Sequence, residues 1–193
     1  MKKLPQVFYQ RADVMKISRE LLGIRLCTNF NGKLTSGIIS ETEAYAGVTD
    51  RASHAFGGKR TKRTEIMFAE GGRAYVYLCY GIHHLFNIVT NKKGIPHAIL
   101  IRGIIPENGI ETMMKRRNMA VGKKNFSSGP GTVSQALGIH FKHSGEELSS
   151  NKIWLEETGI IVPEKEIQVG PRIGVDYAGK DAKLPYRFLW GKK

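Results

Sequence analysis

The chain has only two cysteines among its 193 residues, Cys27 and Cys79, and they lie far apart in separate apolar stretches. This spacing argues against a zinc cluster, and it favours buried free thiols over a disulfide. The six histidines show no metal-ligand spacing with carboxylates or cysteines. We therefore expect no metal ion.

Acidic residues and long apolar runs are also scarce. Asp and Glu total 17 against 30 Lys and Arg, a formal charge of +13, which predicts a polyanionic partner, with nucleic acid first. An anionic membrane is the competing partner, but no run approaches about 18 apolar residues and no basic amphipathic helix stands out. The start, "MKKLPQVFYQ", lacks a signal-peptide core. We expect a cytoplasmic protein, associated with the nucleoid if bacterial.

No repeat, low-complexity tract or linker divides the chain, so we expect a single domain over residues 1–193. Apolar residues at helical spacing behind Asp13 predict a helix, and "KLTSGIISETEAY" predicts a strand. Three apolar, aromatic-rich runs from Arg73 onward predict an antiparallel meander, and helices are expected near Asn108 and after "SSGPG". These elements predict an α+β fold with a central antiparallel sheet and a protruding β-hairpin, flanked by helices.

A candidate site lies in "ISETEAYAGVTDRASHAF". If the strand alternates strictly, Ile39, Glu41, Glu43 and Tyr45 share one face. The Cβ atoms of the two glutamates are then about 6 to 7 Å apart, a spacing at which paired carboxylates serve glycosyl transfer. The alternative is a solvated strand face whose glutamates pair with basic residues.

Two polar residues in the predicted sheet favour a pocket. Asn87 lies in "LFNIV" and Arg102 in "ILIRGII", where burial is costly unless each side chain finds hydrogen-bond partners. Either neighbouring backbone satisfies Asn87, or its amide faces a ligand. Two such residues in one sheet make a polar pocket a stronger expectation than either alone.

The aromatic and basic residues point towards nucleic acid. Tyr75 and Tyr77 share a strand face, while Tyr80 precedes Gly81 at a turn, where its ring can project as a wedge between base steps. Basic residues concentrate in two runs that are candidates for phosphate contact. These candidates are Lys59, Arg60, Lys62, Arg63, Lys115 and Arg116.

The chain resembles the alkyladenine (3-methyladenine) DNA glycosylase family. The matching stretches are "ETEAY" with a histidine nine residues on, "GGRAYVYLCYG", "FNIV", "ILIRGIIP", "SGPG" with "QALGI", and the terminal "PRIGV", "AG" and "PYRF". They run in family order over nearly the whole chain. Ile82 stands where we expect methionine, and His84 where an aromatic ring is common.

The resemblance implies roles for individual residues. The catalytic general base falls on Glu43, which leaves Glu41 as a supporting residue. The intercalating tyrosine falls on Tyr80. The remaining family positions form the base pocket, namely Tyr45, His54 and Tyr77 for stacking, Asn87 for purine discrimination and the active-site Arg102.

The implied activity is a monofunctional DNA-3-methyladenine glycosylase that needs no cofactor. It flips damaged purines such as 3-methyladenine, 7-methylguanine, hypoxanthine and ethenoadenine out of double-stranded DNA and hydrolyses the N-glycosidic bond with water. We expect a monomer without an obligate protein partner. A non-enzymatic minor-groove binder and a hydrolase of RNA or free nucleosides remain the alternatives, and the latter has no use for a wedge or for a charge of +13.

Overall fold

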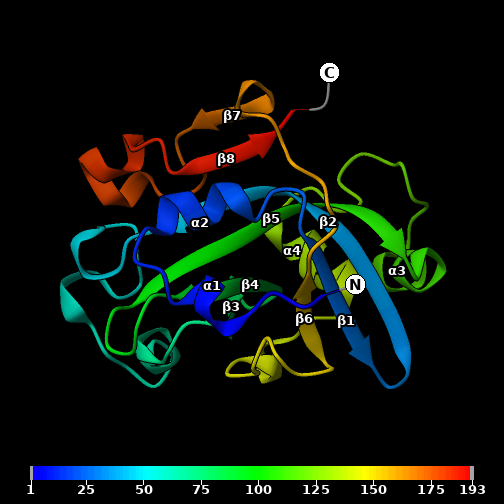
Figure 1. The fold of residues 1–193 in the computed structure, drawn as a ribbon, viewed down its shortest axis with the longest axis horizontal. Helices are drawn as coiled ribbons and strands as arrows, with labels where there is room; N and C mark the ends of the chain where they lie inside the picture. The colour runs from blue at the N-terminus through cyan, green and yellow to red at the C-terminus, as the bar shows by residue number, and fades with distance from the viewer. Residues whose placement is uncertain (1, 192–193) are drawn as a thin grey trace.

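The computed structural model describes residues 2–191, and its centre is a curled antiparallel β-sheet (Figure 1). The strands are β1 Arg25–Phe30, β2 Lys33–Tyr45, β3 Arg73–Cys79, β4 His83–Thr90, β5 His97–Asn108, β6 Ile153–Glu156, β7 Ile167–Gly170 and β8 Arg187–Trp190. Six of them follow the order β3-β4-β5-β2-β1-β6, and β8 pairs with both β2 and β7. All of these pairs are antiparallel.

Short helices connect and cover the strands. The α-helices are α1 Gln6–Tyr9, α2 Val14–Glu20, α3 Ile110–Arg117 and α4 Pro130–Leu137. The 3-10 helices are η1 Gly47–Thr49, η2 Phe56–Gly58, η3 Glu65–Phe68, η4 Phe141–His143, η5 Glu164–Glu166 and η6 Asp176–Lys183. The α+β architecture expected from the sequence is confirmed.

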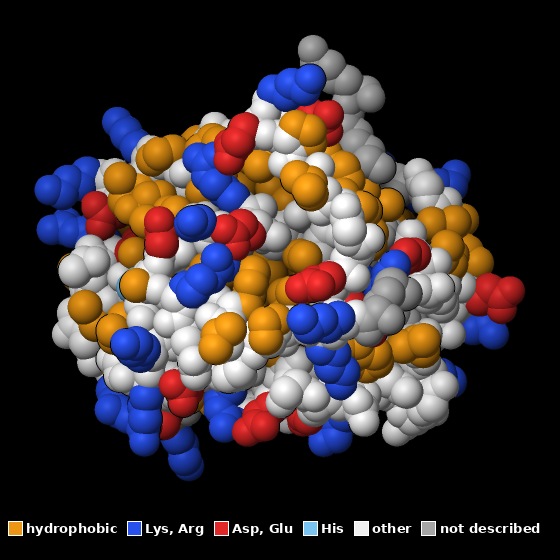
Figure 2. All heavy atoms as spheres, in the orientation of Figure 1, with side chains coloured by type: hydrophobic (Ala, Val, Ile, Leu, Met, Phe, Trp, Pro, Cys, Tyr) orange, Lys and Arg blue, Asp and Glu red, His pale blue; other side chains and the backbone are white. Residues whose placement is uncertain are grey.

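The face that carries α1 and α2 has a mixed surface. Figure 2 shows Lys and Arg side chains interspersed there with Asp and Glu and with apolar groups. Positive and negative side chains are intermixed on this face.

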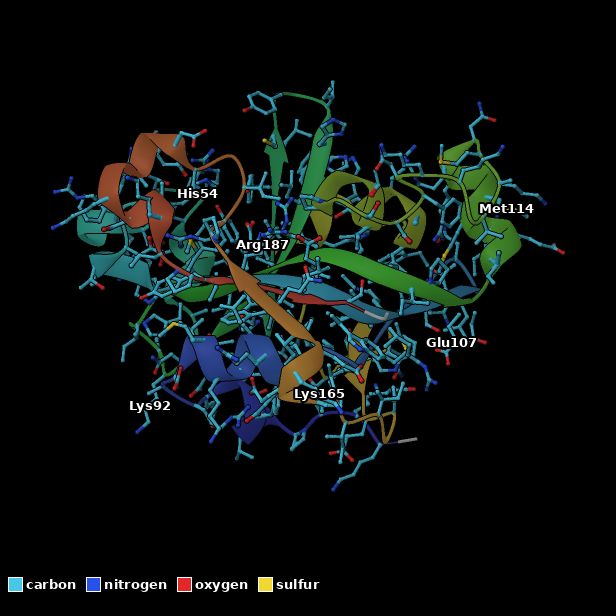
Figure 3. All side chains as sticks on the ribbon, turned by 90° about the horizontal axis from the view of Figure 1, so that it is seen from above. His54, Lys92, Glu107, Met114, Lys165 and Arg187 are labelled. Atoms are coloured by element: carbon cyan, nitrogen blue, oxygen red, sulfur yellow. The ribbon has the colours of Figure 1, made fainter. Side chains whose placement is uncertain are left out.

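The candidate site residues lie on the other side of the sheet. Figure 3 shows α1 and α2 on one side of the sheet and the β3–β4 hairpin projecting from the opposite side.

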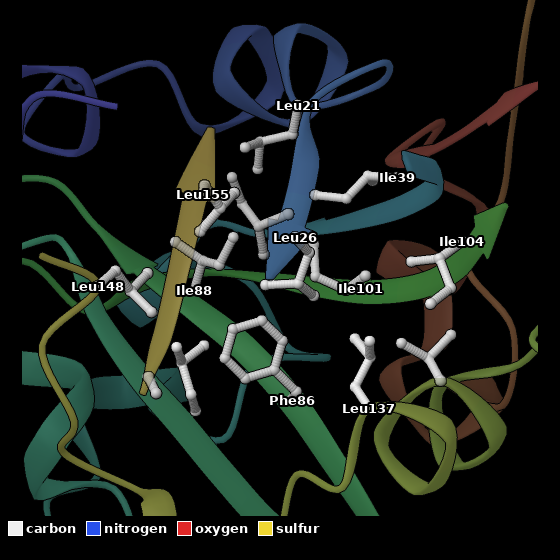
Figure 4. Packing of buried hydrophobic residues seen from close by; sticks show 14 of the residues in the cluster. Leu21, Leu26, Ile39, Phe86, Ile88, Ile101, Ile104, Leu137, Leu148 and Leu155 are labelled. Carbon is white, nitrogen blue, oxygen red and sulfur yellow. The ribbon is translucent and has the colours of Figure 1, made fainter. Parts of the chain in front are cut away.

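The main hydrophobic core joins both helical layers to the sheet. Figure 4 shows Leu21 beside α2, Leu26 on β1, Phe86 on β4 and Leu137 on α4 within one packed cluster. Each of these side chains is fully buried, and burial of such a side chain stabilises the fold by about 1.5 to 3 kcal/mol. This core fixes the strands on which the candidate residues stand.

Most predicted elements are confirmed. The strand "KLTSGIISETEAY" is β2 with the predicted bounds, the meander is β3-β4-β5, and Asp13 Oδ1 accepts a hydrogen bond from the Lys16 N–H at the start of α2. Helix α3 begins at Ile110, two residues later than the expected Asn108. Both cysteines are free, but only Cys27 is buried and Cys79 is partly exposed.

Candidate active site

A row of side chains crosses four strands on the hairpin side of the sheet. Glu43 on β2 pairs with Leu100 on β5, Leu100 pairs with Asn87 on β4, and Asn87 pairs with Tyr75 on β3. Directly paired residues of antiparallel strands point to the same side, so these side chains share a face. Tyr45, two residues beyond Glu43, lies on that face too.

Strand β2 is irregular just before this row. Ile39 pairs with Ile104, and Glu41 pairs with Gly103. Ile104 and Gly103 are consecutive on β5, whereas Ile39 and Glu41 are two positions apart on β2. Ser40 is therefore the extra residue of a β-bulge. Ile39 and Glu41 therefore face opposite sides, and the expected shared face for Ile39 is wrong. A Cβ atom on Gly103 would lie 2.9 Å from Ser40 Oγ and 3.1 Å from Glu41 Cβ, so a larger residue there would displace the bulge.

The Glu43 carboxylate is fully buried and held by three partners. Its Oε2 accepts a hydrogen bond from the Tyr45 hydroxyl at 2.8 Å, and its Oε1 accepts the Ile173 N–H at 2.8 Å and lies 3.3 Å from Arg102 Nε. Burial raises the pKa of Glu43 above its ordinary value, although all three partners act in the opposite direction. A carboxylate with a raised pKa is a better proton acceptor near neutral pH.

Arg102 is shared between two carboxylates. Its Nε lies 3.2 Å from Glu41 Oε1 and 3.3 Å from Glu43 Oε1, and Arg187 donates to the same Glu41 oxygen at 3.0 Å. Both glutamates thus pair with a basic residue, but the solvated strand face that we considered is wrong, because the Glu43 side chain is inaccessible and that of Glu41 is only 12% accessible. Glu41 holds two guanidinium groups in place beside Glu43.

A second buried ion pair stands behind Tyr45. The side chains of Arg172 and Asp50 are almost completely inaccessible, and Arg172 Nη2 donates to Asp50 Oδ1 at 2.9 Å. Arg172 also donates to the Ala44 carbonyl oxygen, and its guanidinium lies 4.8 Å from the ring centre of Tyr45. Asp50 accepts two backbone N–H groups of its own loop. This buried clamp, Arg172 with Asp50, ties the loop after β2 to the segment that delivers the Ile173 N–H to Glu43.

A cavity of about 200 Å³ opens in front of this arrangement. Its lining includes Tyr45, His54, Met67, Tyr75, Tyr77, Tyr80, Leu85, Asn87, Leu100, Arg102, Ile173 and Tyr177. All five residues expected to form a base pocket therefore line one cavity, and Tyr80 stands at the same cavity. Glu43 lies directly behind the wall formed by its partners, with none of its own surface exposed.

His54 forms part of an aromatic corner. Its ring meets Tyr77 edge to face with centroids 4.7 Å apart, and its Nδ1 lies 2.7 Å from the Tyr75 hydroxyl. Burial, followed by the nearby charges of Arg63 and Lys59, lowers the pKa of His54 to about 4. At neutral pH the ring is therefore uncharged.

Asn87 is both satisfied by neighbouring backbone and placed at the cavity, so the two interpretations considered from the sequence are compatible. Its Nδ2 donates to the backbone carbonyl oxygens of Tyr75 and Leu85 at 3.2 and 3.3 Å, and the residue also lines the cavity. The burial of this amide is compensated by backbone. It is therefore a fixed part of the cavity wall.

Tyr80 stands at the tip of the hairpin and is 92% exposed. Its φ of 50° lies in the left-handed region, a conformation that costs a non-glycine residue roughly 1 to 2 kcal/mol. The neighbouring Ile82 is 71% exposed. A strained, exposed aromatic residue at a loop tip is typical of a functional contact.

Known proteins with similar sequences identify the family of this chain. A family described as Methylpurine-DNA glycosylase (MPG) matches residues 7–193. The chain belongs to this family. A protein of Chlamydia felis (strain Fe/C-56) named "Putative 3-methyladenine DNA glycosylase" is 44% identical over 187 residues, which cover 96% of this chain and 95% of that protein. A protein of the same name from Bacillus cytotoxicus is 41% identical over 196 residues, covering 97% and 96%. The resemblance inferred from the sequence motifs is thus confirmed, and the protein is a DNA glycosylase.

For a DNA glycosylase, the placement of basic side chains matters. Lys59, Lys62 and Arg63 are exposed in the loop between η2 and η3. Arg60 is exposed in the same loop and pairs with Glu65 at 2.6 Å. A surface pair of this kind is weak and exchangeable, so all four side chains are free to meet a phosphate.

The second basic run divides into two kinds of residue. Lys115 is exposed on α3, whereas Arg116 is half-buried and donates to Thr35 Oγ1 and to the Ala136 carbonyl oxygen, both at 3.1 Å. Arg116 therefore connects α3 to β2 and α4. We retain Lys115 as a candidate for phosphate contact and assign Arg116 to packing.

Sequence reasoning missed four glycosylase residues: Ile173 and Tyr177, which line this cavity, and Asp50 and Arg172, which form the buried clamp. Arg172 and Ile173 lie within "PRIGV", which carried the resemblance without any assigned role, and Tyr177 follows it. The buried clamp joins residues 122 positions apart, and Ile173 acts through its backbone N–H. Neither kind of contact leaves a periodic pattern in a sequence.

Within residues 2–191, no group of three or more His, Cys, Asp or Glu side chains is arranged to hold a metal ion. In the same part of the chain, no helix has the length and apolar character required to cross a bilayer.

Proposed function

We propose that this glycosylase rotates damaged purines out of duplex DNA into the cavity and hydrolyses their N-glycosidic bond, leaving an abasic site. The observation that carries the proposal is the buried Glu43 carboxylate, which lies behind an aromatic cavity at the foot of a hairpin tipped by Tyr80. A purine inside a duplex is out of reach of such a cavity. Its extrusion costs roughly a few kcal/mol, least for weakened pairs.

Glu43 acts as the general base. Its carboxylate accepts a proton from a water molecule that attacks the sugar C1′ while the glycosidic bond breaks with oxocarbenium character. The raised pKa of Glu43 supports this role. Arg102 and the Ile173 N–H orient the carboxylate. Because Glu43 has no exposed surface, the proposed mechanism requires its partners at the cavity wall to admit a water molecule between the carboxylate and the sugar.

Glu41 is a positioning residue and not a second acid. Its Oε1 already accepts from Arg102 and Arg187. An N-alkylated purine is cationic and leaves without protonation, whereas neutral hypoxanthine or ethenoadenine takes a proton from solvent water as it leaves. No lysine stands in the shared motifs as a Schiff-base nucleophile. The proposed reaction is therefore monofunctional hydrolysis, in which neither a metal nor a cofactor takes part.

The extruded purine stacks between Tyr45 on one side and His54 with Tyr77 on the other. Stacking on aromatic rings favours cationic, electron-poor bases, and the low pKa of His54 removes a positive charge that would repel them. The proposed substrates are 3-methyladenine, 7-methylguanine, hypoxanthine and ethenoadenine. Asn87, whose amide is fixed by two backbone hydrogen bonds, opposes the 2-amino group of ordinary guanine. 7-Methylguanine keeps that group, so its excision depends on its positive charge and its weakened glycosidic bond.

DNA is held from both the groove and the backbone. Tyr80 fills the space that the extruded nucleotide vacates. Lys59, Lys62, Arg63 and Lys115 contact phosphates, together with Arg60 after it exchanges Glu65 for a phosphate. Affinity for duplex DNA therefore falls steeply with salt concentration, and no protein partner is required.

The test is release of base from duplex oligonucleotides that carry hypoxanthine or 3-methyladenine, measured as abasic sites in metal-free buffer. Glu43→Gln is expected to reduce the single-turnover rate by about 100- to 10,000-fold while duplex binding persists. Glu164→Gln, at a side chain that is 77% exposed, is the matched control and should retain full activity. Unchanged activity in Glu43→Gln contradicts the mechanism, and an inactive wild-type protein contradicts the function.

A further inference from the structure

The mouth of the cavity carries two exposed tyrosines, of which the proposed function uses only one. Tyr80 on the hairpin is 92% exposed and Tyr177 on η6 is 70% exposed, and both line the cavity. Ile173, at the same cavity, is 52% exposed. Exposed apolar groups gathered around one opening are typical of a surface that contacts a partner.

Tyr177 is held in place despite its exposure. Its hydroxyl donates to the Ala52 carbonyl oxygen at 3.0 Å, which connects η6 to the loop after β2. Burial of the hydroxyl end raises the pKa of Tyr177, so the group stays a donor at neutral pH. The ring is therefore fixed at one end while most of its surface faces solvent. Such a ring needs little further ordering when it binds.

The two tyrosines come from different elements beside one opening. Figure 3 shows η6 and the β3–β4 hairpin rising on the same side of the sheet, with His54 in the region between them. The cavity is lined from both elements, by Tyr80 on the hairpin and Tyr177 on η6. The rim of the cavity thus has two aromatic walls.

An extruded nucleotide remains joined to its strand on both sides. The sugar-phosphate backbone must therefore enter and leave across the rim of the cavity, and both flanking nucleotides lie against whatever forms that rim. Tyr80 occupies the vacated position in the duplex. A flanking nucleotide is the part of the DNA that remains within reach of the η6 side of the rim.

We propose that the ring of Tyr177 binds a nucleotide of the damaged strand next to the extruded purine, so that the two tyrosines hold the DNA at both sides of the cavity mouth. This inference rests on the proposed base extrusion. It assigns Tyr177 a substrate-binding role that is separate from the chemistry at Glu43. The contact is independent of the lesion, because the flanking nucleotide is undamaged.

A purely structural role of Tyr177 would depend on a different part of its side chain. If Tyr177 served only to tie η6 to the Ala52 loop, its hydroxyl would be essential and its exposed ring would not. Tyr177→Phe removes that hydrogen bond and keeps the ring, whereas Tyr177→Ala removes both. The two variants therefore separate DNA contact from loop packing.

The experiment measures KM and the saturating single-turnover rate on duplexes containing hypoxanthine or 3-methyladenine. Tyr177→Ala should raise KM by about 5- to 20-fold, the effect of losing one stacking contact, with a saturating rate within about 3-fold of wild type. Tyr177→Phe should stay within about 2-fold in KM. Ile161→Ala, at an 88% exposed residue, is the control for loss of exposed apolar surface and should match wild type. Thermal melting verifies that each variant is folded.

Three outcomes overturn the inference while base release by the wild type leaves the proposed function intact. They are wild-type KM in Tyr177→Ala, a defect in Tyr177→Phe as large as that in Tyr177→Ala, and a KM increase confined to one of the two lesions. The expected pattern, a loss in Tyr177→Ala alone and equal for both lesions, supports it. Failure of the proposed function itself is recognised separately, because the wild type then releases no base.

Discussion

The cavity is built from two unlike halves. Glu43 and Asn87 stand on β2 and β4, where the register of the strand positions each side chain, and Arg102 stands on β5 between them, where its pairing with β2 is irregular. The other half comes from loops and η6, and it supplies His54, the Ile173 N–H and Tyr177. A sheet positions side chains through many backbone hydrogen bonds, whereas the loop half depends on a few side-chain contacts, above all the buried clamp.

The largest expected effect is on the loop half. Asp50→Ala leaves the Arg172 guanidinium buried without its counter-ion, and removal of one partner from a buried ion pair costs about 3 to 5 kcal/mol. The free energy of unfolding, from urea denaturation, should fall by that amount. Because the buried clamp positions the segment that contains Ile173, base release should weaken even at temperatures where the variant is folded.

The control for the clamp is a surface ion pair. Glu164→Ala removes the partner of Arg19, and both side chains are accessible. Such pairs contribute about 0 to 1 kcal/mol. If Asp50→Ala costs no more than Glu164→Ala, the loop half does not depend on the buried clamp.

A smaller effect is expected from the titration of His54. The folded protein holds the pKa of His54 at about 4 against an ordinary value of 6.5, so between those values the unfolded chain binds the proton and the folded chain does not. Stability is then complete above pH 6.5 and is lost as the pH falls towards 4. His54→Gln should make this part of the pH dependence shallower, by up to about 3 kcal/mol, in unfolding measured at several pH values.

His143 provides the comparison for this measurement. Its pKa is also lowered to about 4 by burial, followed by Lys142 and His140, but it lies outside the cavity. His143→Gln should flatten the same pH range without altering KM for damaged duplex. If only one of the two substitutions changes the pH dependence, the other histidine is protonated normally in the folded protein.

The two halves also differ in how far the sequence predicts them. Alternation identified Glu43 and Tyr45 as neighbours on one face of β2, and the apolar runs predicted the meander that carries Asn87 and Arg102. The position of Ile39 was wrong because the bulge at Ser40 breaks the period of two.

The loop half left no such pattern in the sequence. The clamp between Asp50 and Arg172 joins residues 122 positions apart, and the Ile173 contribution is a backbone N–H. Family resemblance identified His54, and it gave no role to Tyr177. Contacts between distant loops depend on how the chain returns to the sheet, which local periodicity does not encode.

The smallest predicted effect tests how the sheet half tunes its own base. Glu41 raises the pKa of Glu43 through its negative charge, and it also competes with Glu43 for Arg102. Glu41→Gln removes both influences, so the pKa of Glu43 should fall. The acidic limb of the kcat/KM pH profile, along which Glu43 loses its proton, should move to lower pH, with a plateau within about 3-fold of wild type.

Arg102→Met should move the same limb to higher pH, because Arg102 lowers the pKa of Glu43. Glu65→Gln, at an exposed ion pair, should leave the limb in place. Shifts of Glu41→Gln and Arg102→Met in the same direction would show that the limb reports a group other than Glu43.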